Sequence, residues 1–139
     1  MPFKRILTAV DFSPDSVEGF RIAVEMSSVP SAALHLLHVI EARPTVPVDA
    51  ASEIVEQANA AIDRLVTACR PIPESIEFTT EIANGEPSDE ILSHARGWRA
   101  DLIVLGAKGV ASLESIILGG TAGQIMKGAP CSVLVVRQR

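Results

Sequence analysis

The 139-residue sequence has few aromatic residues, two cysteines and no long apolar run. Aromatic residues make up 4% of the chain and tyrosine is absent, so Val, Ile, Leu and Ala must supply the core. No apolar run reaches the ~18 residues that a membrane-spanning helix requires. The first residues show neither the apolar segment nor the small-residue cleavage site of a signal peptide. We therefore expect a soluble, cytoplasmic protein without a membrane partner.

Concentrated basic charge and metal-ligand spacing are also missing. The net charge is −5 and the 12 Lys and Arg residues are dispersed, whereas nucleic-acid binders usually gather basic side chains into a stripe. Cys69 and Cys131 lack ligand spacing, and we expect both to be buried free thiols. His35, His38 and His94 share no metal spacing, and His35 and His38 should face opposite sides of one strand. These patterns predict neither a nucleic-acid partner nor a metal site.

Strand and helix signals alternate along the whole chain. The predicted strands are 4–11, 32–40, 77–83, 101–105 and 132–136, and the predicted helices are 14–28, 49–70, a third from Pro87, and 121–127. Such alternation predicts a mostly parallel sheet covered by helices on both faces, in one domain spanning residues 1–139. Asn84-Gly85 is predicted to turn the chain. The two long connections, 43–48 and 106–119, are candidates for function.

Two segments follow predicted strands at positions where open parallel sheets bind ligands. Asp11 ends the first strand, and Gly106-Ala107-Lys108-Gly109 follows the fourth, with Gly119-Gly120 ten residues later before a helix. Glycines let the backbone approach a phosphate and adopt positive φ, and consecutive N–H groups at a helix start attract anions. Lys108 adds a positive charge, and Asp11 offers acceptors for ribose hydroxyls. The pattern favours a nucleotide site, although neither a Walker A loop nor G-x-G-x-x-G occurs.

The glycine spacing resembles that of a known family. The universal stress protein family has a strand followed by G-x-x-G, nine residues and then G-[S/T]. This chain has Gly106-Ala107-Lys108-Gly109, then VASLESIIL, then Gly119-Gly120. The segments KRILTAVDFS, LHLLHVI and PCSVLVVR are also similar to that family, so the resemblance covers essentially the whole chain.

The resemblance implies an ATP-binding α/β fold with strand order 3-2-1-4-5, of the adenine nucleotide alpha hydrolase-like type. It implies ATP or another adenine nucleotide as cofactor, with Mg²⁺ as a candidate companion ion. The implied binding residues are Ala9, Val10 and Val39 at the adenine, Asp11 at the ribose or adenine end, Leu105 beside them, and Gly106, Lys108, Gly109, Gly119, Gly120 and Thr121 around the phosphates. It also implies a homodimer through the last strand, formed by Ser132, Val133, Leu134, Val135 and Val136.

Gly120 departs from the family pattern, in which nucleotide-binding members carry Ser or Thr. A hydrogen bond to a charged group contributes about 1.5–3 kcal/mol, or on the order of tenfold to a hundredfold in affinity. We therefore expect weakened or altered phosphate binding. Thr121 lies one residue later and is a candidate to compensate.

Several of these residues also admit structural roles. Asp11 can cap the following turn, Lys108 can be a solvated loop residue, and Gly106 and Gly109 can be turn glycines. Thr121 and Gln124 match the T-x-x-Q capping box.

Three function classes follow from these alternatives. The first is a homodimeric stress-response protein in which nucleotide binding orders residues 106–121 and changes a surface that partners read. The second is a nucleotide-free dimerising module, which the Gly120 departure favours. An enzyme is the least favoured class because the sequence shows no nucleophile–base pair, and at most slow ATP hydrolysis fits.

Overall fold

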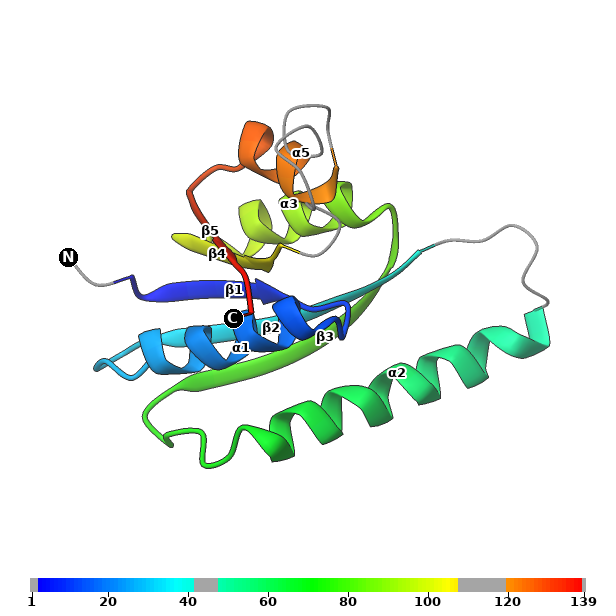
Figure 1. Ribbon diagram of the computed structural model, residues 1–139, viewed down its shortest axis with the longest axis horizontal. Helices are drawn as coiled ribbons and strands as arrows, with labels where there is room; N and C mark the ends of the chain where they lie inside the picture. The colour runs from blue at the N-terminus through cyan, green and yellow to red at the C-terminus, as the bar shows by residue number, and fades with distance from the viewer. Residues whose placement is uncertain (1–2, 42–47, 108–119, 139) are drawn as a thin grey trace.

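The computed structural model describes residues 3–41, 48–107 and 120–138. Five strands form one sheet in the order β3-β2-β1-β4-β5 (Figure 1). They are β1 (Arg5–Ala9), β2 (Ala33–Glu41), β3 (Glu77–Gly85), β4 (Leu102–Gly106) and β5 (Ser132–Val136). Every pairing is parallel, so the predicted fold class and strand order are confirmed.

Helices cover both faces of the sheet. They are α1 (Pro14–Met26), α2 (Val48–Ala68), α3 (Pro87–Trp98) and α5 (Thr121–Gly128). Helices α1 and α2 lie on one face, and α3 and α5 lie on the other (Figure 1). Among the described residues, no helix combines the length and the apolar character needed to cross a membrane.

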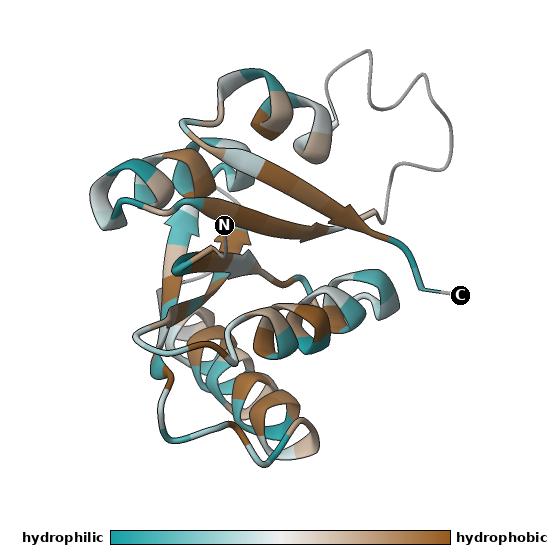
Figure 2. Ribbon diagram, turned by 90° about the vertical axis from the view of Figure 1, so that its left-hand side faces the viewer, coloured by the Kyte–Doolittle hydropathy of each residue, from teal (hydrophilic) through white to brown (hydrophobic). Residues whose placement is uncertain are grey.

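The core has two aliphatic layers, one on each face of the sheet. Ile6 packs toward α1 with Phe20, whereas Leu7 packs toward α3 with Ile91, because successive strand residues face opposite sides. All four side chains are buried. In Figure 2 the hydrophobic colour is strongest along the inner strands and β5, and the helices carry both colours. The predicted aliphatic core is confirmed, with Phe20 as the aromatic exception among the fully buried side chains.

Two sequence-based expectations are corrected by the fold. Asn84 and Gly85 do not turn the chain: they extend β3, opposite Ile40 and Glu41 of β2. The turn preference of Asn-Gly is outweighed here because β2 extends to Glu41 and pairs with both residues. Cys69 and Cys131 are free but half-buried rather than buried, and burial raises the pKa of both thiols.

The start of α1 follows the sequence signals closely. Ser13 is the N-cap, where its Oγ accepts from the Ser16 N–H at 3.3 Å, and Pro14 occupies the first helical turn. Phe12, just before the cap, adopts a left-handed φ of 65°. This tight turn holds the residues after β1 at the carboxyl edge of the sheet, beside the ends of β2 and β4.

Candidate functional site

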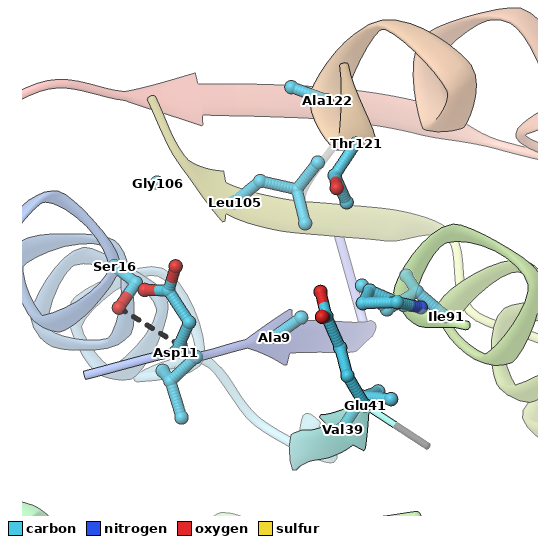
Figure 3. Close-up of a pocket in the computed structure, with 12 residues that line it drawn as sticks. Ala9, Asp11, Ser16, Val39, Glu41, Ile91, Leu105, Gly106, Thr121 and Ala122 are labelled. Atoms are coloured by element: carbon cyan, nitrogen blue, oxygen red, sulfur yellow. Dashed lines mark hydrogen bonds between the residues drawn. The ribbon is translucent and has the colours of Figure 1, made fainter. Parts of the chain in front are cut away.

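A pocket of about 180 Å³ opens at the carboxyl ends of β1, β2 and β4 (Figure 3). This is where the strand order reverses, between β1 and β4, the usual ligand position in open parallel sheets. The strands supply one wall and three helices the others. The lining residues are Ala9, Val10, Asp11, Ser16, Val39, Glu41, Pro87, Ile91, Leu105, Gly106, Thr121 and Ala122.

Most of the predicted site residues that the structure describes line this pocket. Seven do so: Ala9, Val10, Asp11, Val39, Leu105, Gly106 and Thr121. Gly120 is exposed and precedes α5 as its N-cap, outside the lining set. The predictions for Lys108, Gly109 and Gly119 fall outside the described residues. The structure therefore assembles one compact group from segments far apart in the sequence.

Asp11 combines a structural contact with a place in the pocket wall. Its Oδ1 accepts from the Ser13 N–H at 3.0 Å, which closes the turn after β1. Its own N–H donates to Ser16 Oγ at 3.2 Å, and the Ser16 hydroxyl donates to the Ser13 carbonyl at 3.0 Å. The alternative turn-capping role is thus present. Since a carboxylate can accept about four hydrogen bonds, the same side chain can also serve a ligand.

Gly106 is needed for a reason that the sequence did not reveal. A Cβ at this position would lie 2.4 Å from the Ser16 nitrogen and 2.7 Å from the Asp15 carbonyl carbon. Gly106 does not use the positive φ that a glycine permits, since Gly85 is the described glycine that has one. The close neighbour of Gly106 is the first turn of α1, which packs directly against the end of β4. Gly106 therefore brings the Ser16 backbone to the pocket.

The predicted T-x-x-Q capping box is wrong by one residue. Gly120 is the N-cap of α5, with φ −56° and ψ 170°, and no side chain caps the helix. Thr121 is instead the first helical residue, and its side chain lies at the pocket (Figure 3). The side-chain amide of Gln124 is hydrogen-bonded to the Ser88 hydroxyl of α3. The pocket thus receives the N-terminal end of a helix without a side-chain cap, which carries partial positive charge.

Sequence reasoning missed five lining residues: Ser16, Glu41, Pro87, Ile91 and Ala122. The clearest signal was available for Glu41, because it lies two residues beyond Val39 on β2 and so shares its side of the strand. Figure 3 shows its side chain rising from the end of β2, with the carboxylate between Ala9 and Ile91. Pro87 and Ile91 come from α3, whose packing position is a tertiary property.

The start of α3 is fixed by its own cap. Glu86 accepts from the Asp89 N–H at 2.9 Å and from the Ser88 hydroxyl at 2.6 Å. The hydrogen bond from the Ser88 hydroxyl holds the pKa of Glu86 below its ordinary value, although burial acts to raise it. Backbone N–H groups lower the pKa further. The cap places Pro87 and Ile91 in the wall of the pocket.

The described lining residues carry negative charge and no positive charge. Asp11 and Glu41 are the charged residues among them, and no Lys or Arg lines the pocket in the described part of the chain. Ala9, Val39, Leu105 and Ile91 form an apolar surface, and the hydroxyls of Ser16 and Thr121 add polar groups. The arrangement offers an apolar surface to a flat ring and acceptors to hydroxyl groups, and the start of α5 is the one described feature that attracts an anion.

An open parallel α/β domain with its pocket at the reversal of strand order is the class that this geometry defines. The model of the universal stress protein family matches residues 2–137, and the chain belongs to that family. It is 29% identical over 143 residues to universal stress protein MJ0531 of Methanocaldococcus jannaschii, covering 98% of this chain and 83% of that protein.

Solved structures agree with this assignment. Universal stress protein UspA from Lactobacillus plantarum is 28% identical, with a TM-score of 0.79 and 99% of each chain covered. Hypothetical protein MJ0577 shares the fold at a TM-score of 0.83 and 23% identity, with 100% of this chain and 99% of that chain covered.

Three further structures of the same fold contain adenine nucleotides. One universal stress protein is in complex with cAMP (TM-score 0.73, 18% identity, 98% of each chain covered). One from Archaeoglobus fulgidus is in complex with dAMP (TM-score 0.69, 21% identity, 98% and 99% covered). One from Arabidopsis thaliana has AMP bound (TM-score 0.69, 20% identity, 98% and 92% covered).

Proposed function

We propose that this universal stress protein binds an adenine nucleotide in the pocket and acts as a nucleotide-gated, homodimeric regulator. The observation that carries the proposal is the pocket itself, which places apolar wall residues beside polar ones at the reversal of strand order. The aliphatic side chains of Ala9, Val39, Ile91 and Leu105 offer surface to a base. The cAMP, dAMP and AMP complexes of proteins with this fold support the choice of adenine.

The polar groups suggest positions for the rest of the nucleotide. The Asp11 carboxylate offers acceptors to ribose hydroxyls. Thr121 and Ala122 line the pocket at the first turn of α5, where backbone N–H groups favour a phosphate. Gly120, the N-cap, has no side chain that occupies this helix end. We therefore propose that the ribose lies beside Asp11 and the phosphate at the first turn of α5, beside Thr121.

The charge of the pocket bears on the number of phosphates. Each added phosphate brings negative charge toward Asp11 and Glu41, and no described lining residue is basic. ATP therefore requires compensation from Mg²⁺ carried on its phosphates, or from Lys108, which lies outside the described residues. A nucleoside monophosphate requires less. We propose that AMP binds without Mg²⁺ and that ATP binding depends on it.

Gating follows from the elements that the pocket joins. Ser16 belongs to α1 on one face of the sheet, and Ile91 and Thr121 belong to α3 and α5 on the other. A ligand that contacts all of them favours one relative arrangement of the two layers. Gly106 also pairs with Val136 of β5, the edge strand proposed for dimerisation. A change at the pocket can thereby reach the dimer surface.

A nucleotide-free dimerising module is the second candidate. The acidic lining and the glycine at position 120 both favour it, since neither helps to bind a polyanion. It predicts a normal dimer that retains no nucleotide through purification.

Isothermal titration with AMP, ATP and ATP–Mg²⁺ tests the proposal, together with mass spectrometry of any small molecule released on denaturation. We expect AMP to bind, and Asp11→Asn to weaken binding by about tenfold because it removes the charged acceptor. Asn at this position can still accept from the Ser13 N–H, so folding should persist.

Asp63→Asn is the matched control, because Asp63 is exposed on α2 and away from the pocket. It makes the same change of charge and should leave affinity unchanged. Absence of heat and of any thermal shift at millimolar AMP and ATP–Mg²⁺ would reject nucleotide binding and leave the second candidate.

A further inference from the structure

Glu41 is the pocket residue that neither the sequence pattern nor the proposed role of Asp11 accounts for. It ends β2, and its backbone position is fixed by pairing with Gly85 of β3. Its side chain enters the pocket next to Ala9 and Ile91, at the side of the pocket away from Ser16 (Figure 3). Glu41 thus places an exposed carboxylate beside the apolar wall that we assign to the base.

The two carboxylates of the pocket differ in their partners. Asp11 accepts from the Ser13 N–H and so helps to hold the turn after β1. The Glu41 carboxylate has no hydrogen bond or ion pair with another residue in the described part of the chain. A ligand that covers it removes water from its oxygens and must supply a replacement donor.

An ionised carboxylate accepts hydrogen bonds and donates none. We take the carbon-6 substituent of the purine, and not N1 or carbon 2, to face Glu41. There adenine presents an amino group with N–H donors, whereas hypoxanthine and guanine present a carbonyl oxygen and carry their N–H donors on neighbouring atoms. Two acceptors facing each other repel. We infer that Glu41 recognises the exocyclic amino group of the base and selects adenine among purine nucleotides, an inference that rests on the nucleotide site proposed above.

The test compares four ligands by isothermal titration: AMP, purine riboside 5′-monophosphate, IMP and GMP. Purine riboside 5′-monophosphate differs from AMP in the amino group alone, so it isolates the proposed hydrogen bond. Wild-type protein should bind AMP about tenfold to a hundredfold more tightly than purine riboside 5′-monophosphate, the range for a hydrogen bond to a charged group. IMP and GMP should bind more weakly still.

Variants of Glu41 separate recognition of the amino group from general affinity. In Glu41→Ala the affinities for AMP and purine riboside 5′-monophosphate should become equal within about twofold, because the variant protein has no carboxylate to accept a hydrogen bond from either base. Glu41→Gln should keep a reduced preference for AMP, because a neutral amide oxygen still accepts. The same amide can turn to donate to a carbonyl, so its discrimination against IMP should shrink. Glu53→Gln, an exposed charge-matched change on α2, should behave as wild type.

The outcomes distinguish this inference from the proposed function. If wild-type protein binds AMP and purine riboside 5′-monophosphate equally, or GMP as tightly as AMP, the role of Glu41 is wrong while the nucleotide site stands. A preference for AMP that survives in Glu41→Ala also overturns it. If none of the four ligands binds wild-type protein, the nucleotide site fails and the inference fails with it.

Discussion

At the residue scale, Gly106 sets how closely α1 approaches the sheet. We predict that Gly106→Ala lowers the free energy of unfolding by about 1–3 kcal/mol, the usual cost of overpacking. The new Cβ would meet backbone atoms of Asp15 and Ser16 at 2.7 Å or less, and backbone cannot rotate away as a flexible side chain can. Urea denaturation followed by circular dichroism measures the change.

Gly97 provides the matched control for this substitution. It lies in α3, and a Cβ there would meet nothing within 4 Å. Gly97→Ala should therefore raise the free energy of unfolding by about 0.5–1 kcal/mol, because alanine loses less backbone entropy in a helix. A neutral Gly106→Ala variant would show that α1 can shift away from β4 at no cost.

His35 predicts a loss of stability in mild acid. It is buried beside Trp98 and Thr79. Burial holds the pKa of His35 below the ordinary 6.5; the Glu81 carboxylate raises this pKa in part, and His94 and Arg5 lower it further. The unfolded chain therefore binds a proton more readily than the folded one. Stability should be full above about pH 6.5 and decrease as the pH falls toward the folded pKa.

Urea midpoints at about pH 7.5 and about pH 5.5 measure this loss, and His35→Gln should reduce the difference between them. Glu81→Gln should enlarge the difference, since it removes the carboxylate that raises the pKa of His35. If the His35→Gln protein loses as much stability between the two pH values as wild type, protonation of His35 is not the cause.

At the element scale, α3 ends on a residue whose side chain disfavours the conformation. Arg99, its C-cap, adopts the left-handed φ of 59° and ψ of 49° and is exposed. We predict that Arg99→Gly raises the free energy of unfolding by about 0.5–1 kcal/mol, because the left-handed strain of about 1–2 kcal/mol exceeds the entropy that glycine loses. Thermal unfolding measures it, and Arg99→Ala, which keeps a Cβ, should show no such gain.

The strands and helices were predictable because each has a hydrophobic pattern of its own. The boundaries that differ depend on neighbours: β3 continues through Asn84 and Gly85 because β2 continues beside it. Ser13 and Pro14 correctly marked the start of α1, since capping and proline preferences are local. At α5 the same reasoning failed by one residue, because Gly120 takes the cap position that Thr121 was expected to fill.

The candidate site was predictable where it lies at strand ends. Asp11, Val39 and Leu105 follow from the rule that parallel strands present their carboxyl ends at one edge, together with the family resemblance. Ile91 was not predictable, since the position of α3 over the sheet is set by packing between distant segments. Glu41 was missed because the predicted strand stopped at Ile40, one residue too early.

At the scale of the whole molecule, the proposed homodimer depends on β5. It is the outer strand of the sheet beside β4, with a backbone edge that another strand can pair with. We predict that Val135→Lys converts the dimer to a monomer in analytical ultracentrifugation, since a charged side chain at an edge opposes pairing. Val135 is half-buried, and neither core cluster of the described residues includes it, so folding should persist.

Thr80→Lys provides the control for this prediction. Thr80 is exposed on β3, the outer strand at the opposite side of the sheet. The same charge placed there should leave the dimer intact. A Val135→Lys protein that still sediments as a dimer would place the interface elsewhere.

The two halves of α2 differ in how they meet the rest of the fold. Its later residues, including Ile62 and Leu65, are buried in the core with Phe20 and Ile76. Its earlier residues Ile54 and Gln57 instead face an open groove beside His38. Amide protons in the later half should therefore exchange with deuterium only on global unfolding, whereas those in the earlier half should exchange through local opening. The helix would then appear as two kinetic units, although its backbone is continuous.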